Sequence, residues 1–244
     1  MRVPGLLLAA LLALGASGDA RKSGIDFMSP SLQAMQRDDA QNPGQLWVRE
    51  GQALMARVAA NGQRCIDCHA GAALDGVAAR YPRLDGRRAI TLAGRIDQCR
   101  ERRLGLAPQG SDGDEVLALS AWLAQRSRGT PIAPDPRLAD LRQRGAQLWR
   151  QRFGQLNLAC TQCHDERAGQ RLGGAPIPQA HATGYPIYRL EWQTLGSLER
   201  RLRGCLTGVR AEPFAPGAEE WLALEAYLMG RAAGLAHEGV AVRP

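Results

Sequence analysis

The sequence predicts a mainly α-helical protein made by the tandem duplication of one small domain. One cysteine pattern occurs twice, at positions 65, 68 and 99 and again at 160, 163 and 205. Apolar residues recur at helical spacing in two similar segments, residues 114–129 and 219–234. Patterns typical of strands are weak throughout the chain. Together these observations favour two copies of an α-rich unit over one large domain.

Composition agrees with this organisation and narrows the classes of partner. The chain has 244 residues, a formal net charge of +7 and 5% aromatic side chains. This length suits two domains of roughly 100 residues each. The positive charge is almost all arginine, since Lys22 is the only lysine, and scattered arginines favour an acidic protein or a small anionic substrate over nucleic acid. The few aromatic residues predict a thin core that a large apolar cofactor would complete.

The N-terminus has the features of an export signal. Arg2 precedes the apolar run GLLLAALLALG, and small residues follow in ASGDA. The run is shorter than the ~20 residues that cross a bilayer, and no later stretch is long and apolar enough to do so. We therefore expect a cleaved signal peptide over residues 1–20, a periplasmic protein and no membrane span. Residues 21–45 are interpreted as an N-terminal extension.

The rest of the chain divides at a proline-rich segment. RGTPIAPDP, residues 128–136, contains three prolines and predicts a stiff, non-helical linker. The expected domains are residues 46–130 and 139–236, joined by a linker over 131–138 and followed by a tail over 237–244. Each predicted unit has an opening helix, a cysteine motif, a loop-rich middle and a closing helix. Asp112 or Asp114 is the expected cap of the first closing helix.

The repeated segments align over most of each unit. GQALMARVAANGQRCIDCH (51–69) corresponds to GAQLWRQRFGQLNLACTQCH (145–164), YPRLD (81–85) to YPIYRLE (185–191), and RIDQC (95–99) to RLRGC (201–205). Equivalent positions in the two units are therefore expected to have equivalent roles.

CIDCH (65–69) and CTQCH (160–164) match the pattern for covalent attachment of haem c. In a helical turn positions i and i+3 share a face, so the two thiols can meet the two vinyl groups of one haem. The attaching cysteines would be Cys65, Cys68, Cys160 and Cys163, with His69 and His164 as iron ligands. A zinc site would need a second ligand pair, which neither unit contains, and a dithiol motif would not need the histidine. The sequence thus predicts two cytochrome c-like domains, each with one covalently bound haem.

The second axial ligand of each iron follows by elimination. Residues 70–159 contain no histidine, methionine or lysine, which leaves Cys99 in the first unit. Cys205 holds the matching place in the second unit. His181 lies in a loop without a counterpart, and Met229 lies on an apolar helical stripe where core packing is expected. We therefore expect Cys99 and Cys205 to ligate iron.

The alternative for these two cysteines is a disulfide that joins the domains. Such a bridge would not require the same place in each repeat. Thiolate ligation would also stabilise ferric iron, which disfavours a routine electron shuttle at high potential. His237 is expected at the surface.

Arginines surround Cys205. Arg201 lies one helical turn before Cys205, and Arg95 has the same spacing before Cys99, so spacing alone does not select the reactive unit. Nearby cations lower the pKa of a thiol, and guanidinium groups hold oxyanions with paired donors. For Arg200 and Arg203, a solvated basic face or contacts to haem propionates explains the positive charge as well as a role beside the thiol does.

Two long stretches resemble the SoxA family, c-type cytochrome subunits of the periplasmic thiosulfate-oxidising Sox system. They are GYPIYRLEWQTLGSLERRLRGCLTGVRAEPF (184–214) and FMSPSLQAMQRDDAQNPGQLWVREGQAL (27–54). The resemblance implies an L-cysteine S-thiosulfotransferase that joins thiosulfate oxidatively to a cysteine of the carrier protein SoxYZ and passes electrons to haem. It also implies a heterodimer with the monohaem cytochrome SoxX.

The same resemblance assigns roles within the site. Because CIDCH and Cys99 are present, the chain resembles the family members with two haems. Cys205 corresponds to the active-site cysteine, which can carry an extra sulfur as a persulfide, and Arg201 to the catalytic, substrate-binding arginine. Cys99 corresponds to the other cysteine ligand. Competing functions are a dihaem electron-transfer cytochrome, a dihaem peroxidase and a redox-sensing module.

Overall fold

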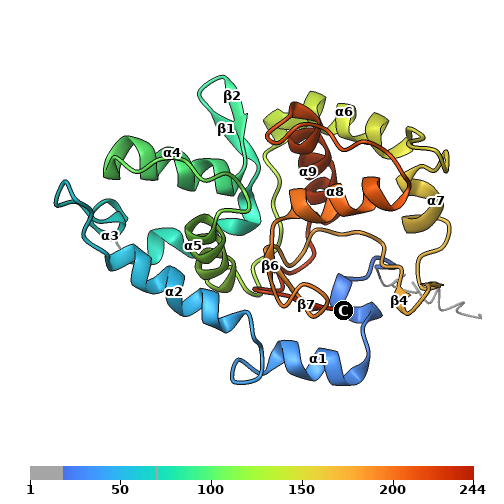
Figure 1. Ribbon diagram of the computed structural model, residues 1–244, viewed down its shortest axis with the longest axis horizontal. Coiled ribbons are helices and arrows are strands. Elements are labelled where there is room, and N and C mark those ends of the chain that lie inside the picture. The colour runs from blue at the N-terminus through green and yellow to red at the C-terminus, as the bar shows by residue number, and fades with distance from the viewer. Residues whose placement is uncertain (1–18, 70) are drawn as a thin grey trace, which may run out of the picture.

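The computed structural model describes residues 19–69 and 71–244, so the expected signal peptide over residues 1–20 lies almost wholly outside the described residues. The chain is mainly helical, which confirms the predicted fold class, and it forms two similar halves that lie side by side (Figure 1). Within the described ranges, each helix is too short or too polar to cross a membrane.

The N-terminal half follows the predicted order of elements. Its elements are α2 (Gln45–Ala56), α3 (Cys65–Cys68), the 3-10 turns η2 (Gly71–Leu74) and η3 (Ala78–Arg80), the strands β1 (Arg83–Asp85) and β2 (Arg88–Ile90), α4 (Leu92–Leu104) and α5 (Asp114–Gln125). The strands form an antiparallel hairpin with Leu84 opposite Ala89. α2 and α5 are the expected opening and closing helices of this unit.

The C-terminal half repeats this order. Its elements are α6 (Ala139–Arg150), α7 (Cys160–His164), β3 (Arg171–Leu172), β4 (Ala175–Pro176), β5 (Ile187–Arg189), β6 (Thr194–Gly196), α8 (Leu198–Gly208) and α9 (Glu219–Arg231). β5 and β6 form a hairpin equivalent to β1 and β2, with Tyr188 opposite Leu195. A cis Tyr-Pro bond precedes each hairpin, at Tyr81-Pro82 and at Tyr185-Pro186.

The opening and closing helices of each half cross at a glycine. A Cβ atom on Gly51 of α2 would lie 2.1 Å from the carbonyl oxygen of Ala118 in α5. A Cβ atom on Gly145 of α6 would lie 2.0 Å from the carbonyl oxygen of Ala223 in α9. Any other side chain would force the helix backbones apart. The duplication has therefore kept the same backbone-to-backbone contact in both halves.

Each half has its own apolar core behind its cysteine motif. The first core consists of Leu54, Met55, Leu74, Ile96, Val116, Ala118, Leu119 and Leu123, with Cys65 packed against it. The second includes Ile132, Trp149, Ala182, Leu198, Leu228, Met229 and Ala232, with Cys160 packed against it. Met229 is buried in this core, which confirms the packing role expected for it.

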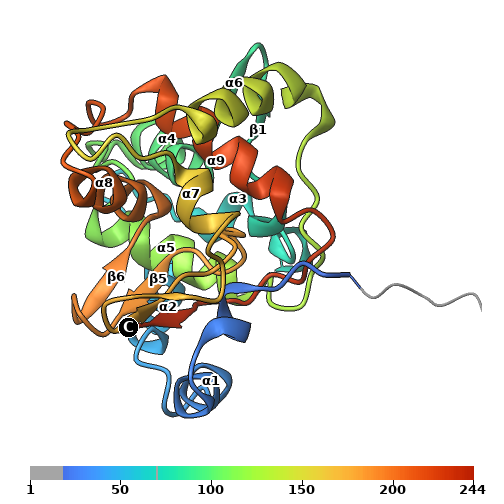
Figure 2. The ribbon, with the colours of Figure 1, turned by 90° about the vertical axis from the view of Figure 1, so that its right-hand side faces the viewer.

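The N-terminal extension and the last residues of the chain pack together. The 3-10 turn η1 (Gly24–Phe27) and helix α1 (Pro30–Arg37) place Ile25, Met28 and Leu32 in one cluster with Val242. The strand β7 (Val242–Arg243) pairs in parallel with β5. Figure 2 shows α1 beneath the sheet that contains β5 and the C-terminus. The extension is thus part of the folded body.

The expectation for His237 is wrong. This residue is 3% exposed, and burial lowers its pKa to about 4. Its backbone forms two hydrogen bonds with the linker: the His237 carbonyl accepts from the Gly129 amide at 2.8 Å, and the His237 amide donates to the Thr130 carbonyl at 2.9 Å. The apolar residues that follow, Val240 and Ala241, are fully buried and draw His237 inward. The sequence did not reveal that this segment pairs with distant parts of the chain.

A buried carboxylate joins the extension to the C-terminal segment. Glu238 accepts hydrogen bonds from Arg243 at 2.6 Å, Thr183 at 2.6 Å, Gln36 at 2.8 Å and the Ser23 hydroxyl. Burial by itself would raise the pKa of Glu238, but Arg243 and these hydrogen bonds hold it at about 2. The carboxylate is therefore charged over the neutral pH range, and four segments depend on it.

The expected cap of α5 is also wrong, for a reason that concerns the site. Gly113 is the N-cap residue, without a side-chain capping bond. Asp112 instead accepts a hydrogen bond from the Ser197 amide at 3.0 Å and forms an ion pair with Arg203 at 2.8 Å. A tertiary contact between the halves has thus replaced the local capping bond.

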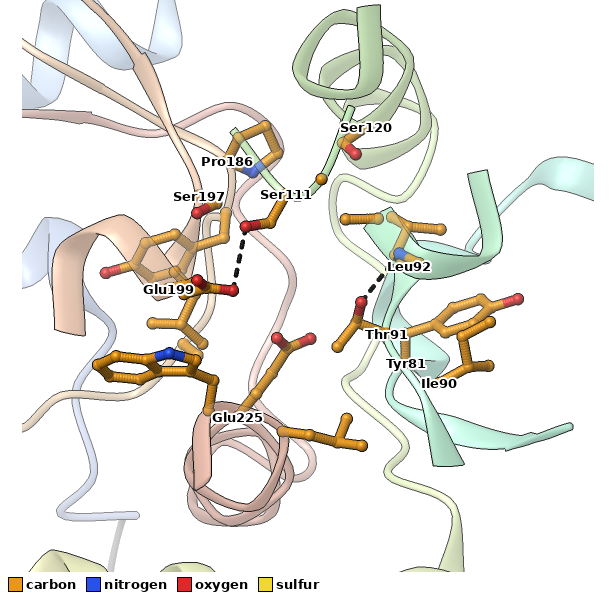
Figure 3. A pocket seen from close by; sticks show the side chains of 18 of the residues that line it. Tyr81, Ile90, Thr91, Leu92, Ser111, Ser120, Pro186, Ser197, Glu199 and Glu225 are labelled. Atoms are coloured by element: carbon orange, nitrogen blue, oxygen red, sulfur yellow. Dashed lines mark hydrogen bonds between the residues drawn. The ribbon is translucent and has the colours of Figure 1, made fainter. Parts of the chain in front are cut away.

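A cavity of about 340 Å³ lies between the halves. Residues at equivalent repeat positions line it from both sides: Tyr81 and Tyr185, Thr91 and Ser197, Leu92 and Leu198, and Ser120 and Glu225. Figure 3 shows Glu199 and Glu225 directed into this space, with Glu199 accepting a hydrogen bond from Ser111. Burial raises the pKa of Glu225 to about 8, and the charge of Glu199 acts in the same direction.

We predict that Glu238→Gln lowers the free energy of unfolding by about 3 kcal/mol near neutral pH, because Arg243 is left buried without its charge partner. The pKa of Glu238 is lower in the folded state, so its contribution is present above the unfolded value and is lost as pH falls towards about 2. Urea unfolding followed by circular dichroism measures both effects. Glu50→Gln, at an exposed ion pair with Arg57, is the control and should change little. Equal stability of the two variants would contradict the prediction.

Glu225→Gln should raise the free energy of unfolding above pH 4.5, opposite to the effect of Glu238→Gln. The folded protein holds a proton on Glu225 that the unfolded chain releases, so the wild type loses stability as pH rises from about 4.5 to about 8. The amide has no such proton, and the variant should match the wild type in acid and exceed its stability at about pH 8. Unfolding titrations at several pH values provide the measurement, and parallel pH profiles for the two proteins would refute this role.

Candidate functional site

The second cysteine motif forms a single helical turn at the edge of the C-terminal core. In α7 the Ala159 amide donates to the Gln162 side chain at 2.8 Å, which closes the start of the turn. Cys160, Cys163 and His164 are all partly buried. The turn therefore holds both thiols and the imidazole within one short segment, as the spacing predicts.

A hydrogen bond and a ring contact hold the imidazole of His164 in place. Its Nδ1 lies 2.8 Å from the Pro178 carbonyl oxygen, so Nδ1 carries the proton and donates it. The ring also packs against Trp149 with centroids 5.5 Å apart, and Trp149 donates to Asp165 at 3.0 Å. Such an outer hydrogen bond sets the tautomer and leaves Nε2 as the available donor atom for a metal.

Helix α8 places Cys205 opposite this motif. The Ser197 hydroxyl accepts a hydrogen bond from the Arg200 amide at 3.0 Å and caps the helix, which fixes where its turns begin. Arg201 and Cys205 then follow one turn apart. Both line a cavity of about 140 Å³ that is also bordered by Cys160 and His164. The fold thus brings together the residues predicted for this site, except that Cys163 does not border the cavity although it lies in the same turn, α7, as Cys160 and His164.

The two thiols that line this cavity, Cys205 and Cys160, have pKa values shifted in opposite directions. Burial would raise the pKa of Cys205, but a hydrogen bond with His164 and the charges of Arg201 and Arg189 outweigh it, and the pKa lies below its usual value. Burial raises the pKa of Cys160 to about 12. Cys205 is therefore the thiol whose anion this half stabilises.

The arginines near Cys205 differ in their contacts. Arg203 is paired with Asp112, and the Arg200 guanidinium lies 4.2 Å from the centroid of the Trp192 ring. Arg210 is exposed. The Arg201 side chain has no hydrogen bond or ion pair with any described residue and borders the Cys205 cavity. Arg201 is thus available to bind an anion there.

The N-terminal half contains an equivalent site. A cavity of about 490 Å³ is lined by Cys65, Cys68, His69 and Cys99. Cys99 lies on α4, which begins with the Thr91 hydroxyl accepting from the Gly94 amide at 3.0 Å. α4 ends at Gly105, whose φ of 68° is left-handed and suits glycine. Burial, together with the neighbouring Cys99, raises the pKa of Cys65.

One charged contact distinguishes the two sites. Arg95, which precedes Cys99 by one turn, forms an ion pair with Asp85 at 2.9 Å, and this bond raises the pKa of Arg95. Arg201, its equivalent, has no such partner. Spacing alone does not distinguish these two arginines, but charge does: of the two, only Arg201 has no ion pair with a described residue.

The structure bears on the disulfide alternative for Cys99 and Cys205 and on His181. The six cysteines are free, and Cys99 and Cys205 border different cavities. His181 also borders the Cys205 cavity, with its Nδ1 2.7 Å from the Lys22 carbonyl oxygen. Burial lowers the pKa of His181. Its contact with the N-terminal extension could not be read from the loop sequence around it.

Sequence reasoning missed two arginines of the C-terminal cavity. Arg189 and Arg243 border it together with Arg201. Arg189 ends the strand β5, and Arg243 ends β7, which is far from the cysteine motif in the sequence. The only available signal was that Arg189 falls inside the repeated YPIYRLE segment.

The donor sets fit haem c. In each half the first cysteine and the histidine of the motif border one cavity with mainly apolar walls, together with a facing cysteine. The second cysteine of the motif lies in the same helical turn as the first. In the C-terminal half the histidine tautomer leaves Nε2 free for iron. Tetrapyrrole iron takes its remaining ligands from such pairs of side chains.

Comparisons with known proteins agree with this geometry. A family model described as "SoxA/TsdA, cytochrome c domain" matches residues 50–132 and 144–236. The L-cysteine S-thiosulfotransferase subunit SoxA of Pseudaminobacter salicylatoxidans is 34% identical, over 92% of this chain and 82% of that protein. The subunit of the same name from Rhodovulum sulfidophilum is 34% identical, over 92% and 81% of the two chains. The crystal structure of SoxXA from P. pantotrophus matches with a TM-score of 0.88 at 30% identity, covering 92% of this chain and 87% of that chain.

These matches extend over both halves of the molecule. The cytochrome c domain implies haem c as the cofactor, and the matched segments include both C-x-x-C-H motifs and both facing cysteines. The protein is a member of the SoxA family.

Proposed function

We propose that this protein is the SoxA-type subunit of an L-cysteine S-thiosulfotransferase, which conjugates thiosulfate oxidatively to a cysteine of a carrier protein. The relatives at 34% identity carry the name of that enzyme. The observation that carries the proposal is the unpaired Arg201 one helical turn from Cys205, on a cavity shared with His164. A basic group and a soft nucleophile at this spacing match the two ends of thiosulfate.

We assign one haem c to each half. Cys65 and Cys68, and likewise Cys160 and Cys163, would form the thioether bonds. His69 and Cys99 would ligate one iron, and His164 and Cys205 the other. When bound, the cofactor supplies iron that accepts electrons released in the reaction. The support for two groups is that each half has a C-x-x-C-H motif whose first cysteine and histidine border a cavity together with a facing cysteine.

The residues of the C-terminal half would act as follows. Arg201 holds the sulfonate oxygens with its guanidinium donors. The Cys205 thiolate bonds to the outer sulfur of thiosulfate, and two electrons leave as the S–S bond forms. The carrier thiolate then attacks that outer sulfur, which releases the Cys205 thiolate and leaves carrier–S–S–SO₃⁻. The carrier proton goes to solvent. Whether Cys205 begins as a thiolate or a persulfide would not change the role of Arg201.

The N-terminal half would not carry this chemistry. Asp85 neutralises Arg95 beside Cys99, so an anionic substrate would meet a compensated charge there. Its haem would serve structure or electron transfer. This contact is the observation that favours a plain electron-transfer role for one half of the protein.

The proposed setting is the periplasm, reached through a cleaved signal peptide over residues 1–20. The P. pantotrophus structure is named as a SoxXA complex, which supports a SoxX-like monohaem cytochrome as the partner of this chain. SoxYZ would be the carrier that provides the acceptor cysteine.

Cys205→Ser should reduce thiosulfate conjugation at least about a hundredfold, because the nucleophile is lost. The assay measures conjugate on the carrier by mass spectrometry, with the partner cytochrome present. Cys99→Ser, at the equivalent position of the other half, is the matched control and should stay active. Full activity of Cys205→Ser with both haems attached would refute the assignment.

Intact mass of the mature protein should equal the chain plus two haems, with or without one extra sulfur. A double serine variant at positions 65 and 68 should lose one haem, and a double variant at 160 and 163 should lose the other. A wild-type mass with a single haem would contradict the proposed cofactor content.

A further inference from the structure

Three arginines border the Cys205 cavity, and they are not equivalent. Arg243 is already bound, since it donates to Glu238 at 2.6 Å and to Gln36 at 2.6 Å. Arg201 has no side-chain partner among the described residues. Arg189 has one ion-pair partner, Glu191, and has no role in the mechanism above. The inference that follows concerns Arg189 and rests on the proposed function.

Arg189 is a buried cation with unused donors. It is 8% exposed, and its Nη2 pairs at 2.5 Å with Glu191, whose side chain is 66% exposed. Its guanidinium also lies 5.1 Å from the centroid of the Trp192 ring. The buried Nε has no hydrogen-bond partner. Unsatisfied donors of a buried guanidinium are costly, and one exposed carboxylate compensates the charge only in part.

Arg189 and Arg201 act on each other as like charges. Burial lowers the pKa of Arg189, and the positive charge of Arg201 lowers it further. Both also lower the pKa of Cys205. In the described residues, no carboxylate is paired with Arg201 to separate the two guanidinium groups. Two adjacent cations on one cavity form a site for a divalent anion.

The N-terminal half has a pair of opposite charges at the positions equivalent to Arg189 and Arg201. Asp85 and Arg189 occupy equivalent positions, since each ends the first strand of its hairpin, four residues after the tyrosine of a cis Tyr-Pro pair. Arg95 and Arg201 are also equivalent. Asp85 forms an ion pair with Arg95, whereas Arg189 repels Arg201. The same frame therefore holds a neutral pair in one half and a doubly positive pair in the other.

We propose that Arg189 is a second substrate-binding residue of the Cys205 site, and that it shares the sulfonate of thiosulfate with Arg201. Thiosulfate carries two negative charges, which the two guanidinium groups balance. Each guanidinium can donate paired hydrogen bonds to sulfonate oxygens. A propionate of haem c offers the same kind of charged oxygen, so the experiment must separate these two anions.

The test uses the haem-loaded protein in complex with its partner cytochrome. Arg189→Gln should raise the KM for thiosulfate about tenfold to a hundredfold, with a smaller change in kcat, because charged hydrogen bonds to bound substrate are lost. Arg189→Lys keeps the charge and should lie between wild type and Arg189→Gln. Arg189→Asp rebuilds the charge arrangement of the N-terminal half and should have the largest effect. Arg200→Gln is the matched control, because Arg200 contacts the same Trp192 ring and does not border the cavity.

Two further readouts make the outcomes distinct. Calorimetric titration with sulfate or thiosulfate, without carrier, should show weaker binding to Arg189→Gln, and wild-type binding should weaken with salt. Haem content and midpoint potential should stay unchanged. A shifted potential or lost haem with an unchanged KM would identify a propionate as the partner of Arg189 and overturn the proposal. Unchanged binding, KM and potential would also overturn it. A wild type that binds the anion but forms no conjugate would refute the proposed function and leave the Arg189 site supported.

Discussion

The close crossing of two helices organises each half of this protein. Where Gly51 meets Ala118, and where Gly145 meets Ala223, the backbones touch and no side chain separates them. This contact fixes the angle and depth at which the opening helix lies on the closing helix. The cysteine motif follows directly from the opening helix, so its position depends on that crossing. The cysteine-bearing helices α4 and α8 then complete the two cavities from the other side.

The two halves share a backbone arrangement and differ in one charged residue near the cysteine-bearing helix. A hairpin strand ends at Asp85 in one half and at Arg189 in the other, and each residue faces the arginine that precedes the cysteine by one turn. Both residues occupy the last position of a short strand, and the turn that follows has two residues in the first half and four in the second. Duplication thus supplied two similar frames, each with a C-x-x-C-H motif and a facing cysteine, and the charges beside those cysteines differ between the halves. The interface between them carries its own polar contacts, from Asp112 to Arg203 and from Ser111 to Glu199.

Local patterns predicted much of this molecule, and distant contacts account for what they missed. Helical periodicity predicted α5 and α9, and the repeat indicated that Cys99 and Cys205 hold equivalent places, as they do on α4 and α8. The signals for these features lie within a few helical turns. His237 is buried because the strand after it pairs with β5, and Asp112 binds the other half of the molecule instead of capping its own helix. Arg189 and Arg243 join the site through a sheet whose strands are far apart in sequence. No window of sequence contains both partners of such contacts.

The Glu238 network has a consequence for how the chain matures. Its partners come from both ends of the sequence, Ser23 and Gln36 near the start and Arg243 near the end. Residues that are synthesised last are thus partners of the first described segments, which cannot complete these contacts until the end of the chain is made. Until then β7 is absent from the edge of β5, and the wall that Arg243 contributes to the Cys205 cavity is missing. The order of synthesis therefore leaves that cavity open on one side until the last strand is in place.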